Sequence, residues 1–149
     1  MNIIPIGLIK SPVTEPRDEN WADVVSEIHL SDRFVKGLEG LEAFSHVTVV
    51  FFMHQATFDA ATDLVRRPRG RDDMPLIGIF AQRARHRPNQ IGITTVRILH
   101  VKEGVLTVKG LDAINDTPVL DLKPCFPAWD EAKNAVAPKW VDELIKNYF

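Results

Sequence analysis

Seven short segments rich in apolar and β-branched residues recur along the chain, and they constrain its fold more than any other feature. Turn-forming or breaker residues separate them, including Ser11-Pro12, Lys102-Glu103-Gly104 and Asn115-Asp116. This alternation predicts a mostly β domain. The segments are residues 3–9, 24–30, 46–54, 76–81, 93–101, 105–111 and 118–122.

The clearest pair of these segments reads ITTVRILHV-KEG-VLTVKGL, from residue 93 to residue 111. A short connection that ends in glycine favours a hairpin, because glycine readily adopts positive φ. We therefore expect antiparallel pairing here, with a three-residue connection that ends at Gly104.

Two stretches have helical spacing. Residues 32–44 place Phe34, Leu38 and Leu41 near one side, but Gly37 and Gly40 weaken the pattern, so we expect a short or distorted helix. A second helix is predicted after Pro138, and it must pack on an apolar surface of this chain or of a second copy. Its apolar side comprises Trp140, Val141, Leu144, Ile145 and Tyr148.

The chain length fits one domain over residues 1–149, and no internal repeat or linker divides it. A domain of this size can bury a sufficient core without disulfides or a structural metal. Cys125 is the only thiol, and the five histidines show no zinc-binding spacing, so we expect no metal. Because no apolar run approaches about 20 residues and no signal peptide is evident, we expect a cytoplasmic protein that does not enter membranes.

The charge is strongly uneven. Residues 66–87 carry a local charge of +5, whereas the rest of the chain carries −7, giving the net −2. The guanidinium group suits bidentate contact with phosphate or carboxylate, although a charged run can also be solvated surface or pair internally. The arginines in this segment are Arg66, Arg67, Arg69, Arg71, Arg83, Arg85 and Arg87.

The usual nucleotide-binding motifs are absent. The sequence contains no G-x-G of a Rossmann site, no G-x-x-x-x-G-K-[ST] phosphate loop and no G-x-S-x-G. His46 and His54 end one expected strand and would lie about 26 Å apart at about 3.3 Å per residue, too far to share a metal. These absences exclude an ordinary dinucleotide or ATP site.

The most unusual segment is GIFAQRARHRPNQIGIT, residues 78–94. If extended, it would align Arg83, Arg85 and Arg87 on one side as a row of forked donors. Pro88 would stiffen the following loop, and Gly92 would allow a ligand or another backbone to approach closely. The segment indicates an anion-binding loop, or an arginine-rich edge strand that guards against aggregation.

Four motifs in this order resemble the TrmO family, also called TsaA-like or YaeB-like. They are IGLIKSP, GLEGLEAFSHVTVVFFMHQ, GIFAQRARHRPNQIGIT and GLDAINDTPVLDLKPCFPAWD, and the match covers residues 3–130. Members of this family are S-adenosylmethionine-dependent methyltransferases that act on N6-threonylcarbamoyladenosine beside the tRNA anticodon. The resemblance implies a compact β-barrel with short flanking helices and a homodimer whose donor sites lie near the subunit interface.

The resemblance also implies the site residues. The S-adenosylmethionine contacts would be Glu19, Asn20, Trp21, His54, Gln55, Arg83, Ile93, Lys109, Gly110, Leu111 and Asp112. A guanidinium suits the donor's carboxylate, and a carboxylate such as Asp112 suits its ribose hydroxyls. Arg66, Arg67, Arg85 and Arg87 are candidate phosphate contacts, and His86, Asp121 and Lys123 are candidate substrate contacts.

Other interpretations of these residues stay open. Asp112 could cap a turn, Arg83 could pair with an acidic neighbour, and His54 could be a core histidine. The protein could also methylate a small molecule, or bind S-adenosylmethionine or RNA without turnover.

The chain departs from the family pattern at four places. Gln82 replaces the Thr of F-A-T-R, and Gln90 replaces the second Pro of R-P-N-P. Asn115-Asp116 replaces Asp-Gly, which the turn tolerates because Asn can adopt positive φ. Cys125 replaces a Tyr after Lys-Pro, and the loss of an aromatic hydroxyl there bears on the methyl acceptor more than on the donor.

Overall fold

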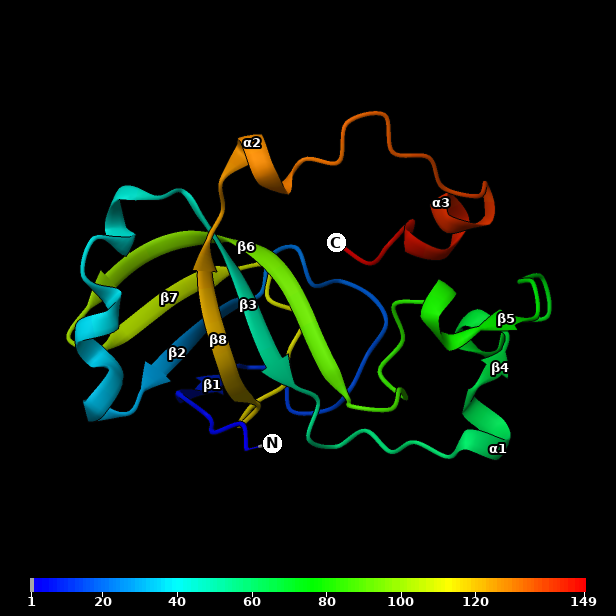
Figure 1. Cartoon of the computed structure of the whole chain (residues 1–149), viewed down its shortest axis with the longest axis horizontal. Coiled ribbons are helices and arrows are strands. Elements are labelled where there is room, and N and C mark those ends of the chain that lie inside the picture. Colours follow the sequence, from blue (N-terminus) through cyan, green and yellow to red (C-terminus); the bar gives the residue numbers. More distant parts are fainter. Residues whose placement is uncertain (1) are drawn as a thin grey trace.

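The computed structural model describes residues 2–149, so Met1 of the expected domain lies outside it. Within this range six strands form a closed antiparallel barrel in the order β1-β2-β7-β6-β3-β8, and β8 pairs back with β1 (Figure 1). Closure pairs every barrel strand on both sides. The expected β-barrel is confirmed. Its strands are β1 (Gly7–Lys10), β2 (Val25–Leu30), β3 (His46–Phe52), β6 (Ile91–Lys102), β7 (Val105–Lys109) and β8 (Pro118–Pro124).

The barrel interior is filled by alternate side chains of its strands. In β3, Val47, Val49 and Phe51 are buried while the residues between them are more exposed. This alternation follows from the two-residue period of a strand, which sends successive side chains to opposite faces. Ile28 of β2 and Leu106 of β7, both 0% exposed, meet them in the same core.

Gly92 of β6 lies opposite Phe51 of β3. A Cβ atom at Gly92 would lie 2.3 Å from the Phe51 ring. The close approach expected at this glycine therefore occurs, and the group that uses it is an aromatic ring of the neighbouring strand.

The β6–β7 hairpin is confirmed, with a tighter turn than expected. Lys102 pairs with Val105, so only Glu103 and Gly104 form the connection. Their φ values of 50° and 80° are both positive, as a type I′ hairpin turn requires.

The expected helix at residues 32–44 is two 3₁₀ segments, η1 (Asp32–Leu38) and η2 (Leu41–Ala43). Gly40 separates them with a φ of 86°, a conformation incompatible with a continuous helix. The distortion predicted from the glycines is confirmed.

Between β3 and β6 the chain leaves the barrel through residues 53–90, here called the excursion (Figure 1). Its ends are adjacent, because the Met53 N–H donates to the Gln90 carbonyl at 2.8 Å. The strand expected at residues 76–81 is reduced to β5, because a 3₁₀ turn begins at Ile79. The excursion contains α1 (Ala60–Asp63), β4 (Val65–Arg66), η3 (Pro68–Gly70), β5 (Ile77–Gly78) and η4 (Ile79–Ala81).

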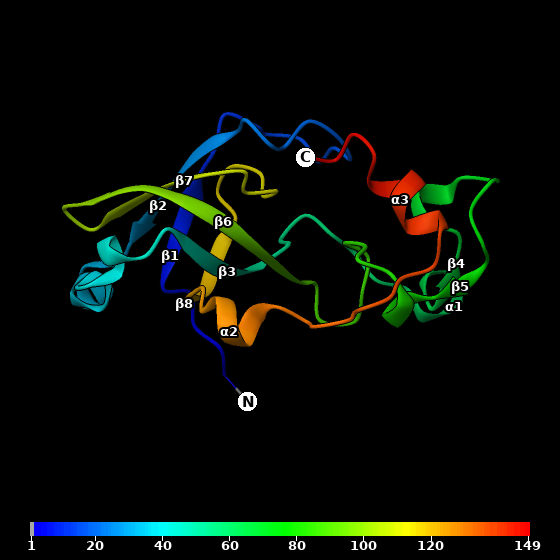
Figure 2. The same cartoon turned by 90° about the horizontal axis from the view of Figure 1, so that it is seen from above.

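After β8 the chain forms α2 (Pro127–Asp130), which the sequence pattern did not predict, and α3 (Trp140–Ile145). The predicted terminal helix is confirmed but is only six residues long. Residues 138–149, here called the tail, pass from the side of the excursion back to the loop before β2 (Figures 1 and 2). Across residues 2–149, no helix combines the length and the apolar character needed to cross a membrane.

Candidate functional site

Asp112 lies at the centre of the candidate site, two residues beyond the turn that ends β7. Gly110 makes this turn with a φ of 90°, and its N–H donates to the Val24 carbonyl at 2.8 Å. One Asp112 carboxylate oxygen accepts a hydrogen bond from the Thr94 hydroxyl of β6. The other accepts from the Tyr148 hydroxyl at 2.6 Å. These two hydrogen bonds hold the Asp112 carboxylate in place. Because each carboxylate oxygen can accept two hydrogen bonds, both oxygens can still accept one from a ligand.

Tyr148 comes from the tail and is largely buried. Its ring packs against the cluster of Trp21, Val24 and Ile114, while the Arg69 guanidinium lies over it, 5.6 Å from the ring centre. Burial, with the neighbouring Asp112 charge, raises the pKa of the Tyr148 hydroxyl far above its ordinary value. The hydroxyl therefore keeps its proton at neutral pH and acts as a donor.

The tail is also paired with the backbone before β2. The Asn20 N–H donates to the Asn147 carbonyl, and the Trp21 N–H donates to the Tyr148 carbonyl, both at 2.9 Å. The Trp21 side chain is only 2% exposed, and its Nε1 donates to a backbone carbonyl at 3.3 Å. Of the expected contacts at 19–21, the Trp21 indole thus belongs to the core, whereas Glu19 is exposed.

Arg83 reaches this region from the end of the excursion. Its guanidinium is exposed and donates to the Ile93 carbonyl at 2.8 Å. Ile93 immediately precedes Thr94, which holds Asp112. The structure thus links residues from five separate parts of the sequence through direct contacts: Asn20-Trp21, Arg83, Ile93-Thr94, Asp112 and Tyr148.

The remaining residues expected to contact S-adenosylmethionine lie at the ends of nearby strands. Lys109 at the end of β7 forms an ion pair with Asp23 at 2.7 Å. Leu111 is 0% exposed, so its side chain belongs to the core. His54 follows β3, where its Nδ1 lies 3.4 Å from the Thr117 hydroxyl, and Gln55 beside it is exposed.

The expected row formed by Arg83, Arg85 and Arg87 is wrong. Residues 82–90 are irregular, and each side chain takes a separate direction. Arg87 donates to the Gln82 carbonyl at 3.1 Å, whereas the Arg85 Nε donates to the imidazole of His86 at 3.2 Å. The irregular backbone leaves its carbonyl groups free of a strand ladder, and the Arg87 guanidinium satisfies that of Gln82 instead.

The candidate RNA contacts lie in two places. Arg66 pairs with Asp63 at 3.5 Å, and Arg67 donates to the Met74 carbonyl, both within the excursion. Each guanidinium carries five N–H donors, so further donors remain for an anion. Asp121 and Lys123 lie on the barrel strand β8 and pair with each other at 2.7 Å.

Two departures from the family pattern have structural roles. Gln82 is 6% exposed, and its amide donates to the carbonyls of Arg66 at 2.8 Å and Ile77 at 3.0 Å, which ties β4 to β5. Gln90 has a φ of 52°, which proline cannot adopt, and its amide donates to the Ala56 carbonyl at 2.6 Å. The turn at this position therefore has a geometry that the usual R-P-N-P sequence excludes.

Cys125 is half-buried at the end of β8, and its N–H donates to the His46 carbonyl at 3.0 Å. Desolvation, with the nearby Asp130 carboxylate, raises the pKa of its thiol. A cysteine in this environment stays protonated and is not an activated nucleophile.

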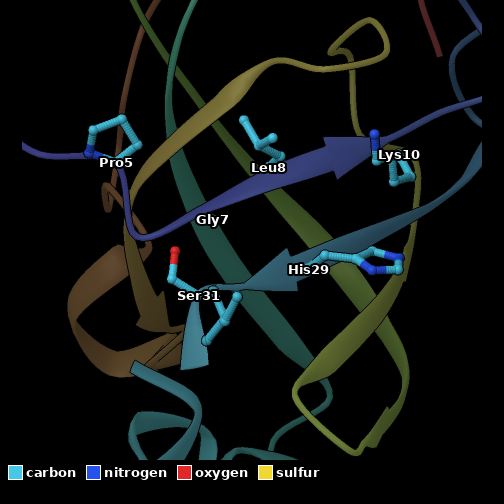
Figure 3. Close-up of a pocket in the computed structure, with 7 residues that line it drawn as sticks. Pro5, Gly7, Leu8, Lys10, His29 and Ser31 are labelled. Carbon is cyan, nitrogen blue, oxygen red and sulfur yellow. The ribbon is translucent and has the colours of Figure 1, made fainter. Parts of the chain in front are cut away.

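A separate hollow lies on the barrel surface over β1 and β2 (Figure 3). None of the residues expected to bind S-adenosylmethionine or RNA lines this hollow, so we do not assign the hollow to the candidate site. Its lining comprises Pro5, Gly7, Leu8, Lys10, His29, Leu30 and Ser31.

The fold places the protein among closed six-stranded antiparallel β-barrels, and in this chain the excursion reaches Tyr148 through Arg69 while Tyr148 bonds to Asp112. Residues 8–131 match the profile of the tRNA-methyltransferase O N-terminal domain, and the chain belongs to that family. The resemblance seen in the four sequence motifs is thereby confirmed.

A solved structure and two relatives illustrate the similarity. The crystal structure of TrmO from Pseudomonas aeruginosa superposes with a TM-score of 0.74 at 33% identity, covering 94% of this chain and 61% of that chain. An S-adenosyl-L-methionine-binding protein of Archaeoglobus fulgidus is 36% identical over 134 residues, covering 87% of this chain and 93% of the relative. The human tRNA (adenine(37)-N6)-methyltransferase is 38% identical over 101 residues, 68% of this chain but 22% of the human protein.

Proposed function

We propose that the protein is an S-adenosylmethionine-dependent methyltransferase that methylates N6 of N6-threonylcarbamoyladenosine beside the tRNA anticodon. Membership of the family supports this, as do the relatives that carry a tRNA methyltransferase name and an S-adenosylmethionine-binding name. The observation that carries the proposal is that Arg83 and Asp112 each hydrogen-bond to one of two consecutive residues of β6, Arg83 to Ile93 and Asp112 to Thr94.

The side chains of Arg83 and Asp112 fit the chemistry of S-adenosylmethionine. The exposed Arg83 guanidinium can pair with the donor's carboxylate, and Asp112 can accept from its ribose hydroxyls. Asp112 suits the second role because its present partners leave acceptor capacity on both oxygens. The remaining contacts come from backbone and side chains at Asn20, His54, Gln55, Lys109 and Gly110.

Orientation accounts for most of the catalysis that these residues provide. S-adenosylmethionine supplies the methyl group, and its leaving thioether requires no protonation. Arg83 and Asp112 would hold the carboxylate and the ribose of S-adenosylmethionine, and the excursion would hold the acceptor beside it. Correct placement of two reactants can contribute about 7–11 kcal/mol to lowering a barrier.

The acceptor side is formed by the positive excursion. Arg66, Arg67, Arg85 and Arg87 would contact phosphates. His86 on the excursion, with Asp121 and Lys123 on β8, would contact the substrate. Large apolar side chains on the excursion are strongly exposed, with Leu76 at 64% and Phe80 at 79%. Their exposure supports a homodimer in which a second copy of the chain covers these side chains. We also propose that the protein acts in the cytoplasm.

Incubating the purified protein with labelled S-adenosylmethionine and unfractionated tRNA tests the activity. Nucleoside mass spectrometry should then find the label on N6 of threonylcarbamoyladenosine. Label transferred only to small molecules would replace the tRNA assignment, and binding of the donor without any transfer would indicate a noncatalytic module.

Affinity for tRNA is expected to fall steeply with salt. Each phosphate neutralised by a cation contributes about 0.7–0.9 to the slope of log K against log salt, so four arginine contacts predict a slope near −3. Filter binding across low to moderate salt measures it. A flat dependence would remove the excursion arginines from the RNA-binding surface, and Arg85→Ala should reduce the slope by about one contact.

Replacing Arg83 by alanine should weaken S-adenosylmethionine binding about tenfold or more, because a charge-assisted hydrogen bond contributes about 1.5–3 kcal/mol. The exposed side chain makes little contribution to folding, so the melting temperature should hardly change. Calorimetric titration provides the measurement. Arg85→Ala is the matched control on the same loop and should leave donor affinity unchanged; equal affinity in both variants would exclude Arg83 from the site.

Sedimentation at micromolar concentration should show a dimer. Phe80→Asp, which places a charge on the proposed contact, should shift the protein to monomer while the barrel stays folded. A wild-type protein that is monomeric and still binds S-adenosylmethionine tightly would contradict a donor site shaped by two subunits.

A further inference from the structure

We propose that Tyr148 is a positioning residue of the donor site, which fixes the Asp112 carboxylate in the orientation that accepts the ribose hydroxyls. The C-terminal tail would then be a part of the binding site and not an appendage to the barrel. This inference rests on the proposed function and extends it to a segment beyond residues 8–131, the range matched by the family.

The tail is held at this position from three sides. The carbonyl groups of Asn147 and Tyr148 accept hydrogen bonds from the backbone of Asn20 and Trp21, both at 2.9 Å. The Tyr148 ring is packed on the Trp21 cluster and covered by the Arg69 guanidinium. Barrel, N-terminal loop and excursion therefore all meet at this one side chain.

The two donors to Asp112 act on different oxygens. Thr94 reaches Oδ1 from β6, and Tyr148 reaches Oδ2 from the tail. The terminal torsion of an aspartate has a broad energy profile, so one hydrogen bond alone would let the carboxylate rotate. Two hydrogen bonds, one to each oxygen, restrict this rotation and so fix the directions of the remaining lone pairs.

The tyrosine suits this role better than water does. The hydroxyl donates and keeps its proton, so it cannot compete with Asp112 as the charged acceptor for ribose. A buried donor also has a fixed position, whereas a water molecule must lose freedom to take it. The ring supplies that position through its packing on Trp21 and Ile114.

Tyr148→Phe in the 149-residue chain is the test, because it removes the hydroxyl and retains the packed ring. Titration calorimetry should use two probes: S-adenosylmethionine, and an analogue lacking both ribose hydroxyls. We expect about tenfold weaker binding of S-adenosylmethionine and unchanged binding of the analogue. Thr94→Val should behave alike, since it removes the other donor to Asp112.

Thr48→Val is the matched control. Thr48 also bonds across β3 and β6, to the Thr95 hydroxyl at 2.8 Å, but it does not contact Asp112. This variant should bind both probes as the wild type does. Equal weakening of both probes by Tyr148→Phe would indicate a merely structural role and overturn the proposal, as would no weakening of either.

A measurement without ligand separates this inference from the proposed function. In protein labelled with ¹³C-aspartate, the Asp112 carboxyl resonance should move in Tyr148→Phe and stay in place in Thr48→Val. An unchanged resonance in Tyr148→Phe would overturn the positioning role. A wild-type protein that binds neither probe, with the resonance moving as expected, would instead contradict the proposed function alone.

Discussion

Replacing Asp112 by alanine is expected to weaken S-adenosylmethionine binding by about 10- to 100-fold. The variant loses the acceptor for the ribose hydroxyls, and hydrogen bonds to a charged group contribute about 1.5–3 kcal/mol. It also leaves the hydroxyls of Thr94 and Tyr148 without their acceptor, so some loss of stability should accompany the loss of binding. Calorimetry and thermal unfolding measure the two effects separately.

Asp116→Asn is the appropriate control for this experiment, because the φ of 62° at Asp116 is one that asparagine tolerates and alanine does not. Asp116 lies in the same connection between β7 and β8 but is exposed, where it pairs with Lys10 at 2.6 Å. Exposed ion pairs contribute about 0–1 kcal/mol, so this variant should bind the donor normally and unfold at nearly the wild-type temperature. Similar donor affinities in the two variants would exclude Asp112 from the donor site.

Replacing Gly7 by alanine should lower the free energy of unfolding by about 1–3 kcal/mol or more, the range for overpacking a core. Gly7 pairs with Leu30, and a Cβ there would lie 2.4 Å from the His29 carbonyl oxygen. Backbone atoms cannot rotate away as a side chain can. The seam between β1 and β2 must therefore open for the methyl group to fit.

Gly37→Ala provides the comparison in a denaturant titration. A Cβ at Gly37 would meet nothing within 4 Å, and the residue lies in a 3₁₀ turn, so alanine should be neutral or stabilise by about 0.4–1 kcal/mol. If both variants unfold at the same denaturant concentration, the tight β1–β2 seam does not limit stability.

The strands were predictable because each carries its own signal. Alternating burial in β3 and the glycine-ended turn after β6 both follow from residues that are neighbours in sequence. Closure of the barrel had no such signal, since β1 and β8 pair across more than one hundred residues. The family resemblance supplied that information instead.

The site was predictable only in part. Motif matching selected Arg83, Ile93 and Asp112; the structure bonds Arg83 to Ile93, and Asp112 to Thr94, the residue after Ile93. It did not select Tyr148, which the helical pattern grouped with apolar residues although it is the only tyrosine in the chain. A hydroxyl that bonds to a carboxylate 36 positions away follows from tertiary packing and not from periodicity. The roles assigned to the site residues stay predictions until the variants are measured.

The prediction that Arg83, Arg85 and Arg87 form a row was wrong for a related reason. A two-residue period aligns side chains only where the backbone is a strand, and residues 82–90 are not one. Pro88, and the positive φ at Gln90, keep this stretch from joining a sheet. Local composition therefore indicated the right charge but not its arrangement.

The single hydrogen bond between Met53 and Gln90 has an evolutionary consequence. Because it joins the two points where the chain departs from and re-enters the barrel, the intervening residues form one large loop on a finished scaffold. Lengthening such a loop costs little, about 0.6 kcal/mol for each doubling. Relatives of this barrel can accordingly differ in the length of this segment without a change in strand register.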